Sequence, residues 1–485
     1  MKQLHLLYLI VLISLAGLTG CMKDEGNYTY VEPNNLEIRN IADNYSVLQG
    51  SYLQIIPNLV PSDPAAVDSA RYTYEWISLM MGATSLDMKR VLGYNRSLQM
   101  TMNLPAGKYT MYYRVKDTLS GIQFQKSFMI EVTSAIYEGW MAMTDVNGKA
   151  RLDMISKLNN QYRVIPDVLT FAGSDLKLQG KPVNINCFKI SALSTGYGIY
   201  ISTDKTTDRV DPETFQYKST LNIKYEMLSN VPETFAPAAF ANAGAYRVFM
   251  LEGTDVYYYY YVMNIRFGLP INLLKGETIP FQVAPFIATS TATTATCLYD
   301  NTNKRFVRHV GDDGSCGLMP EGTLFDWKTG KDLVYMAYTT FNNGNVYAIL
   351  RDPVSGKYYL ARFLFGNNIQ QVYYEEMTAT DMAQAANFAV NPDFGYIFYT
   401  VGSKLYSYDM SLKTSKLMID KGSKSFSMLQ FRGSTLVAGS VDPAQPEGAN
   451  GTLEEYTVPP VQGDLVLVNT WNGLGKIVAA SYRTR

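Results

Sequence analysis

Short runs in which apolar and polar residues alternate, separated by turn-forming residues, make up most of the chain from position 31 onward. Between positions 31 and 134, proline- and glycine-rich breakers separate these runs. Regular short strands with such turns are typical of an antiparallel β-sandwich. The strands predicted here are Leu36–Ile38, Tyr52–Ile56, Tyr72–Ile77, Leu98–Met102, Tyr109–Asp117 and Phe124–Val132.

A larger pattern repeats from Tyr137 onward, where two apolar runs flank a polar turn and a longer polar stretch follows. The turns are rich in Asn, Asp, Gly, Ser and Lys, as hairpins require. The clearest hairpins pair Gly139–Thr144 with Ala150–Ile155, Thr296–Tyr299 with Arg305–Val310, Asn345–Leu350 with Tyr358–Leu364, and Tyr396–Thr400 with Lys404–Asp409.

Repeats of about 40–50 residues are typical of β-propeller blades. Cutting the chain at its long polar stretches gives the units 137–180, 181–234, 235–288, 289–330, 331–378, 379–421 and 422–485. We therefore predict an all-β protein with an immunoglobulin-like β-sandwich at 31–134 and a β-propeller, seven-bladed by this division, at 137–485. Only Thr380–Ala386 carries a short helical period. Asp442–Gly463 is rich in Pro, Gly and Glu and is interpreted as an inserted loop, which is plain, caps the channel or reaches a partner.

The first residues have the pattern of an export signal. Lys2 precedes an apolar stretch, Leu6–Leu18, which is shorter than the roughly 20 residues that cross a membrane. Leu18-Thr19-Gly20-Cys21 resembles the lipobox of bacterial lipoproteins, in which the cysteine thiol accepts the lipid. We predict a signal peptide at 1–20, lipid attachment at Cys21, and a tether at 21–30.

The residues after this cysteine bear on localisation. Lys23, Asp24 and Glu25 resemble the surface-export signal of Bacteroidetes lipoproteins, although a plain solvated tether would look similar. Acyl chains give stable anchoring, since each buried CH₂ contributes about 0.8 kcal/mol. The prediction is an outer-membrane lipoprotein, held to the membrane by its lipid and facing outward.

Charge and histidine content exclude several function classes. Lys plus Arg number 42 and Asp plus Glu 43, so the net charge is -1 and no basic excess exists for nucleic acid. His309 is the only histidine outside the export signal, which excludes multi-histidine metal sites. It lies in a strand-like run, where a structural role is the more common one.

Catalytic chemistry is not visible in the remaining pattern. Neighbouring carboxylates such as Glu375 and Glu376 point to opposite faces of a strand, and no metal-ligand spacing occurs. We predict no catalytic residue, no metal and no cofactor. Cys297 and Cys316 could form a disulfide, while Cys187 is interpreted as a small buried hydrophobe.

Aromatic residues are the better candidates for ligand contact. The chain has 37 Tyr, and Tyr257–Tyr261 places tyrosine on both faces of one strand. Trp327 and Trp471 lie in turn-like contexts. Trp327, Trp471, Tyr258 and Tyr260 are the candidates for stacking on a sugar or peptide, with packing in the core as the alternative for each.

Taken together, these segments resemble the PKD-like (polycystic-kidney-disease-like) family of Bacteroidetes lipoproteins. The likeness rests on Tyr74-Glu75-Trp76 and on four further segments. They are Cys21 with 23–30, the strand Gly107–Asp117, Tyr137–Trp140 with Asn147–Met154, and Trp471–Val478. The usual W-x-F-G-D-G turn is absent after Trp76. The resemblance implies a surface accessory role beside SusC/SusD-like uptake systems, in capturing glycans or other polymers, and supplies no catalytic residue.

Three functions remain as hypotheses. The first is a non-catalytic lipoprotein that binds glycan or peptide with its propeller and uses the sandwich as a spacer. The second is a propeller hydrolase or lyase acting on polysaccharide, which requires Asp, Glu or Tyr side chains to converge. The third is a scaffold for the transporter proteins that binds no small ligand.

Overall fold

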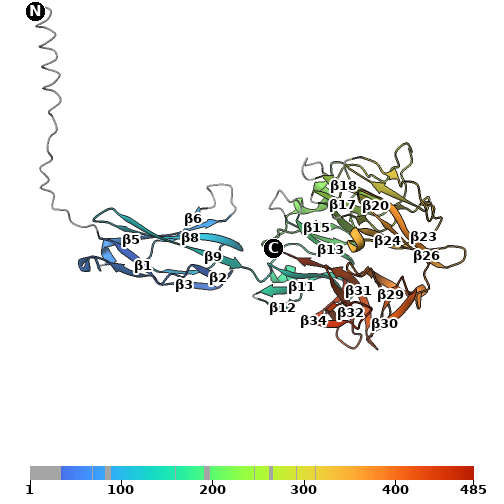
Figure 1. Cartoon of the computed structure of the whole chain (residues 1–485). Helices are drawn as coiled ribbons and strands as arrows, with labels where there is room; N and C mark the ends of the chain where they lie inside the picture. The colour runs from blue at the N-terminus through green and yellow to red at the C-terminus, as the bar shows by residue number, and fades with distance from the viewer. Residues whose placement is uncertain are drawn as a thin grey trace, which may run out of the picture. The chain divides into compact units, whose positions relative to one another are not determined.

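The computed structural model describes residues 34–67, 69–81, 89–158, 160–189, 197–244, 246–260, 266–290, 292–311 and 313–484. These residues form two compact units (Figure 1). Of the described residues, one unit comprises those within 34–103 and 107–132, and the other those within 104–106 and 133–484. Within the described residues, no helix has the length and apolar character needed to cross a membrane.

The first unit is a β-sandwich built around one five-stranded antiparallel sheet. The order in this sheet is β2 (Asn44–Leu48), β9 (Gln123–Thr133), β8 (Gly107–Asp117), β5 (Tyr72–Met80), β6 (Lys89–Gly93). Two ribbons accompany it, β1 (Leu36–Arg39) with β4 (Asn58–Pro61) and β3 (Tyr52–Ile55) with β7 (Leu98–Thr101); the 3₁₀ turns are η1 (Pro64–Val67) and η2 (Ser69–Arg71).

Strict alternation along β8 shows how the sequence specifies this sheet. Every second residue from Tyr109 to Asp117 is buried, so one face of the strand belongs to the core. Trp76 is fully buried, its ring stacks 4.1 Å from that of Tyr113, and its indole nitrogen donates to the Asn95 carbonyl at 2.8 Å. The alternation of Tyr72, Tyr74 and Trp76 with polar residues in the sequence predicts that Trp76 is a core residue, and its burial confirms this.

The second unit consists of seven antiparallel sheets arranged as the blades of a propeller. Their strands are β12 (Gln161–Ile165), β11 (Lys149–Leu158), β10 (Gly139–Val146) and β35 (Lys476–Arg483); β13 (Pro182–Lys189), β14 (Tyr197–Thr203) and β15 (Thr207–Arg209); β16 (Ala239–Ala243), β17 (Arg247–Glu252) and β18 (Asp255–Tyr260); β19 (Ala288–Thr289), β20 (Thr296–Asp300), β21 (Arg305–His309) and β22 (Gly317–Leu318); β23 (Asp332–Thr339), β24 (Asn345–Arg351), β25 (Tyr358–Leu364) and β26 (Gln370–Glu376); β27 (Ala386–Val390), β28 (Ile397–Val401), β29 (Lys404–Asp409) and β30 (Thr414–Asp420); β31 (Ser425–Arg432), β32 (Thr435–Val441), β33 (Gly451–Thr457) and β34 (Val466–Leu474).

One edge strand from each sheet contacts the corresponding strand of the next sheet, and the ring closes. The contacts run β35, β13, β16, β19, β23, β27, β31 and back to β35. The predicted all-β fold class, with a propeller of seven blades, is confirmed. The short helical elements are α2 (Val168–Phe171), η4 (Ser219–Leu221), η5 (Ile223–Glu226), η7 (Phe341–Asn343) and η8 (Met382–Gln384).

The first blade is completed by the last strand of the chain. β35 pairs antiparallel with β10, from Gly139 opposite Arg483 to Asp145 opposite Lys476. The division of the sequence into blades assigned these last residues to the seventh unit, and this assignment was wrong. Local pattern cannot show a pairing between opposite ends of a unit.

Two further sequence interpretations need correction. The region Asp442–Gly463 is not simply an inserted loop, because it contains β33, whose Leu453 is fully buried in the seventh blade. The helical period at Thr380–Ala386 yields only the single 3₁₀ turn η8.

The two cysteines considered for a disulfide are free thiols. Cys297 packs in the same core as Met336, whereas Cys316 packs in a different core with Ile271. The two side chains are therefore buried in separate hydrophobic layers.

Candidate functional site

The residues predicted for anchoring and export, Cys21, Lys23, Asp24 and Glu25, lie outside the described residues. Their roles therefore remain predictions.

Trp327 lies inside the core shared by the fourth and fifth blades. Its ring is 9% exposed and meets the rings of Phe306, Phe325 and Phe363 at centroid distances of 5.9, 5.1 and 4.9 Å. Protein atoms occupy the positions that a stacked sugar would need, so core packing, the alternative weighed for this residue, describes its environment.

Trp471 is also 9% exposed, and it packs in the core between the first and seventh blades. Its ring lies 5.0 Å from that of Tyr162, whose side chain is exposed. Trp471 therefore supports an exposed neighbour and has little free surface of its own.

Tyr258 and Tyr260 project from one face of β18, and Tyr257 and Tyr259 from the other. Tyr258 is buried beside His309, with ring centroids 5.3 Å apart, and the Arg247 guanidinium lies 4.6 Å from the Tyr260 ring centre. The expected distribution of tyrosine over both faces is confirmed. Tyr258 and Tyr260 share one face of β18, but the structure places this pair, Trp327 and Trp471 in three separate cores of the propeller.

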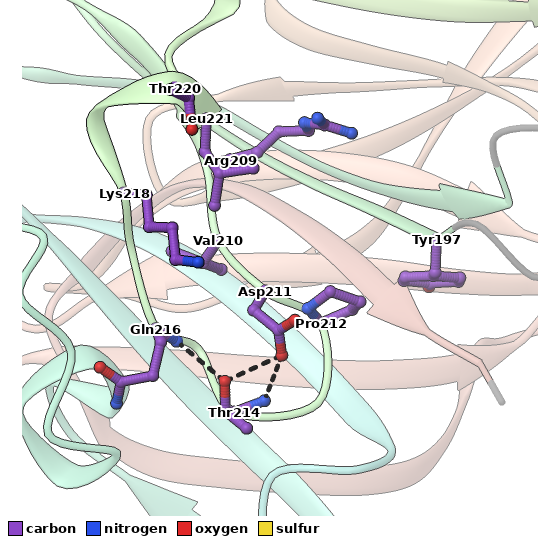
Figure 2. A pocket seen from close by; sticks show the side chains of 10 residues that line it. All are labelled: Tyr197, Arg209, Val210, Asp211, Pro212, Thr214, Gln216, Lys218, Thr220 and Leu221. Carbon is purple, nitrogen blue, oxygen red and sulfur yellow. Dashed lines mark hydrogen bonds between the residues drawn. The ribbon is translucent and has the colours of Figure 1, made fainter. Parts of the chain in front are cut away.

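The most developed candidate site is a hollow of about 430 Å³ on the second blade, beneath the segment that follows β15. We call it the Lys218 hollow (Figure 2). It is lined by Tyr197, Arg209, Val210, Asp211, Pro212, Thr214, Gln216, Lys218, Thr220 and Leu221. Its volume lies in the range of about 300–1,000 Å³ typical of small-molecule sites.

A tight turn shapes one side of this hollow. The Asp211 carboxylate accepts from the N–H and the hydroxyl of Thr214, both at 2.8 Å (Figure 2). It also accepts from the backbone N–H of Glu213 at 3.0 Å. Asx turns of this kind fix a loop without help from a sheet. Phe215 then takes a positive φ of 56° and is fully buried.

β35, the strand that completes the first blade, supports this turn through Arg483. The Arg483 guanidinium lies 5.2 Å from the Phe215 ring centre and donates to the carbonyl oxygens of Pro212 and Ile136. Arg483 is itself fully buried. The floor of the Lys218 hollow thus depends on the C-terminal end of the chain.

A second, smaller hollow of about 190 Å³ shares Arg209 and Thr220 with the first. We call it the Glu226 hollow, and its other lining residues are Tyr200, Tyr225, Glu226, Tyr259 and Arg266. These side chains come from the second blade, the third blade and the turn η5. Sequence reasoning predicted none of them.

Glu226 is the central charged group of the smaller hollow. One carboxylate oxygen lies 2.7 Å from Arg209 Nε, and the other accepts from the Tyr200 hydroxyl at 3.0 Å. Burial raises the pKa of Glu226, although Arg209, Tyr200 and Arg266 each act to lower it. Burial likewise raises the pKa of Tyr197, to about 12, and that of Tyr259, so both phenols are neutral at pH 7.

The two hollows together offer hydrogen-bond donors and acceptors beside aromatic and aliphatic surface. Such a combination binds a polar ligand through hydrogen bonds and its C–H faces through dispersion contacts. No group of three or more His, Cys, Asp or Glu is placed to hold a metal ion in the described part of the chain.

One family model matches a part of this chain. The sequence model of the PKD-like family matches residues 21–182. The match covers the sandwich and continues through the first three strands of the first blade, up to the start of β13. A search of curated proteins found no match.

Among solved structures, a quinonprotein alcohol dehydrogenase-like protein from Bacteroides thetaiotaomicron is 12% identical, with 92% of this chain and 96% of that chain covered and a TM-score of 0.40. A protein from Lactobacillus plantarum is 11% identical over 72% of this chain and 100% of its own, with a TM-score of 0.43. A puromycin-hydrolyzing peptidase from Mycobacterium tuberculosis is 13% identical over 74% and 51%, with a TM-score of 0.39. Likeness at this level says nothing about function.

Proposed function

We propose that this chain is a non-catalytic, ligand-binding lipoprotein of the outer membrane that faces the cell exterior. In this proposal Cys21 carries the lipid, and the propeller binds a saccharide or another polymer in the Lys218 hollow as an accessory of a nutrient-uptake system. The observation that carries the proposal is the Lys218 hollow itself. Its apolar lining and hydrogen-bonding rim fit a polyhydroxylated ligand.

Affinity electrophoresis against a panel of polysaccharides and peptides tests the binding function. We expect at least one polysaccharide to retard the mature protein, and the double substitution Gln216→Ala with Lys218→Ala to abolish most of the retardation. Both residues are exposed, so the fold should tolerate their loss. Lys275→Ala is the matched control, because Lys275 is also exposed and lines neither hollow. Equal retardation of all three proteins would refute the assignment of the site.

The second candidate function is a polysaccharide hydrolase or lyase, and the Glu226 hollow is the observation that favours it. A buried carboxyl in a hollow lined by three tyrosines and two arginines is a setting in which proton transfer can occur. Prolonged incubation of each bound polysaccharide, followed by mass analysis of products, decides the matter. If the wild-type protein releases products and the Glu226→Gln variant does not, the hydrolase or lyase function replaces the non-catalytic proposal.

The anchor and the partners belong to the same proposal and have their own test. Mass spectrometry of the N-terminal peptide from membranes should find acyl chains on Cys21, and Cys21→Ser should release the protein. Pull-down of the lipidated protein should recover SusC/SusD-like outer-membrane proteins if the accessory role is correct. Recovery of those proteins without any polysaccharide binding would favour a scaffold.

A further inference from the structure

We propose that the Lys218 hollow selects ligands that carry a carboxylate, and that its ligands are acidic saccharides containing uronic-acid residues. This inference rests on the proposed binding function and specifies its ligand class. Its basis is the distribution of satisfied and available charges around the hollow.

One oxygen of the carboxylate that lines the Lys218 hollow is engaged within the protein. Asp211 accepts three hydrogen bonds from Glu213 and Thr214 of its own turn through this oxygen, and they offset part of its charge. It therefore opposes a ligand anion less than a free surface carboxylate would.

The two cations of the hollow differ in availability. Arg209 is held by Glu226 at 2.7 Å, and its guanidinium also lies 5.6 Å from the Tyr200 ring centre. Lys218 is exposed and forms no ion pair with any residue that the structure describes. Figure 2 shows its side chain extending over Val210, while the Arg209 guanidinium points away from Asp211. Lys218 is therefore the group that can meet a ligand carboxylate.

The rest of the lining suits a sugar ring. Tyr197, Pro212 and Leu221 provide apolar surface for C–H faces. The Thr220 hydroxyl and the side-chain oxygen of Gln216 provide neutral hydrogen-bonding groups for hydroxyls, whereas the Thr214 hydroxyl is bonded to Asp211. An uncharged saccharide would satisfy these groups and leave the Lys218 ammonium without a counter-charge. A uronic-acid residue offers hydroxyls to the neutral groups and a carboxylate to the Lys218 ammonium.

Glu226 has a positioning role in this arrangement. Its carboxylate pairs with Arg209, which lines both hollows, and offsets the Arg209 charge. Replacing Glu226 by Gln removes the carboxylate charge and keeps a hydrogen-bond acceptor for Tyr200. The Arg209 charge then becomes available to the ligand, so this variant should bind acidic saccharides more tightly.

Titration calorimetry at fixed ionic strength tests the inference with three acidic oligosaccharides, built from galacturonate, mannuronate and glucuronate, each beside its carboxyl-reduced form. We expect at least one acid form to bind roughly tenfold or more tightly than its reduced form, as a charge-assisted hydrogen bond implies. Lys218→Gln should lose that preference while retaining affinity for the reduced form. Lys275→Gln should keep the preference, and Glu226→Gln should increase it.

Three results would overturn the inference. They are equal binding of acid and reduced forms, equal loss of both forms in Lys218→Gln, and binding of only neutral members of the polysaccharide panel. The last of these would leave the binding function intact, whereas failure to bind any member of the panel would refute the binding function as well.

Discussion

At the scale of single residues, two buried polar side chains are paired with partners far away in the sequence. The Trp140 indole donates to Glu455 at 2.8 Å, across 315 positions, and Arg71 holds Asp117 across 46. Sequence patterns placed Trp76 in the core because it alternates with polar neighbours. They gave no indication of Arg209 and Glu226, which meet only because a three-residue strand and a 3₁₀ turn fold against each other.

The Asp117–Arg71 pair makes the sandwich sensitive to acid. Arg71 and the backbone N–H groups of Leu119 and Ser120 hold the pKa of Asp117 below its usual range. Its stabilising effect is therefore complete above about pH 4, the ordinary pKa of Asp, and declines as the pH falls further. Asp117→Asn should lower the free energy of unfolding by about 2 kcal/mol at pH 7 and by less at pH 3.

Urea titrations of wild-type and Asp117→Asn protein at both pH values measure this difference. Asp43→Asn serves as control, because Asp43 pairs with Lys126 on the surface, with 80% of its side chain exposed, and should change stability little. A stability loss of the same size at pH 3 and pH 7 would show that the charge of Asp117 does not matter.

At the scale of elements, the strands of the four clearest hairpins were predicted to within three residues at each end, because their turn residues flank runs of period two. β2, β4 and β6 were missed. β4 ends at Pro61, inside a stretch that was interpreted as a breaker, and edge strands tolerate proline. The candidate site lies in the polar stretch after β15, which the repeat pattern treated only as a spacer between blades. No sequence pattern distinguishes Arg209, Asp211 and Glu226 from the other charged residues of the chain.

Close packing of two strands gives a test at this scale. A Cβ on Gly451, at the start of β33, would lie 1.8 Å from the Gly475 carbonyl oxygen, and a backbone atom cannot move aside cheaply. Gly451→Ala should lower the free energy of unfolding by at least about 2 kcal/mol. Gly314→Ala is the control, since nothing lies within 4 Å of its Cβ position. Thermal melts of equal midpoint for both variants would contradict the packing described.

At the scale of the whole propeller, closure of the ring and formation of the hollow are linked. β35 completes the first blade, and Arg483 at its end supports the Asp211–Gln216 turn through Pro212. The sequence could not reveal this link, because it joins the last residues to the first and second blades. Propellers remove exposed sheet edges by closing, so an open ring would expose the edge of β10.

Deleting residues 476–485 should therefore leave an aggregation-prone protein that binds no ligand, whereas deleting residue 485 alone should change little. Size-exclusion chromatography and circular dichroism of the two truncated proteins measure the outcome. A monomeric, folded protein lacking 476–485 would contradict the role of β35 in closure.

The central claim is that this propeller holds its ligand noncovalently at the second blade. Hydrogen–deuterium exchange, measured by mass spectrometry with and without a saturating polysaccharide from the binding panel, tests it most directly. The account predicts that protection increases in peptides spanning 197–226 and that other blades change little. Protection confined to other blades, with 197–226 unchanged while the polysaccharide is bound, would contradict it.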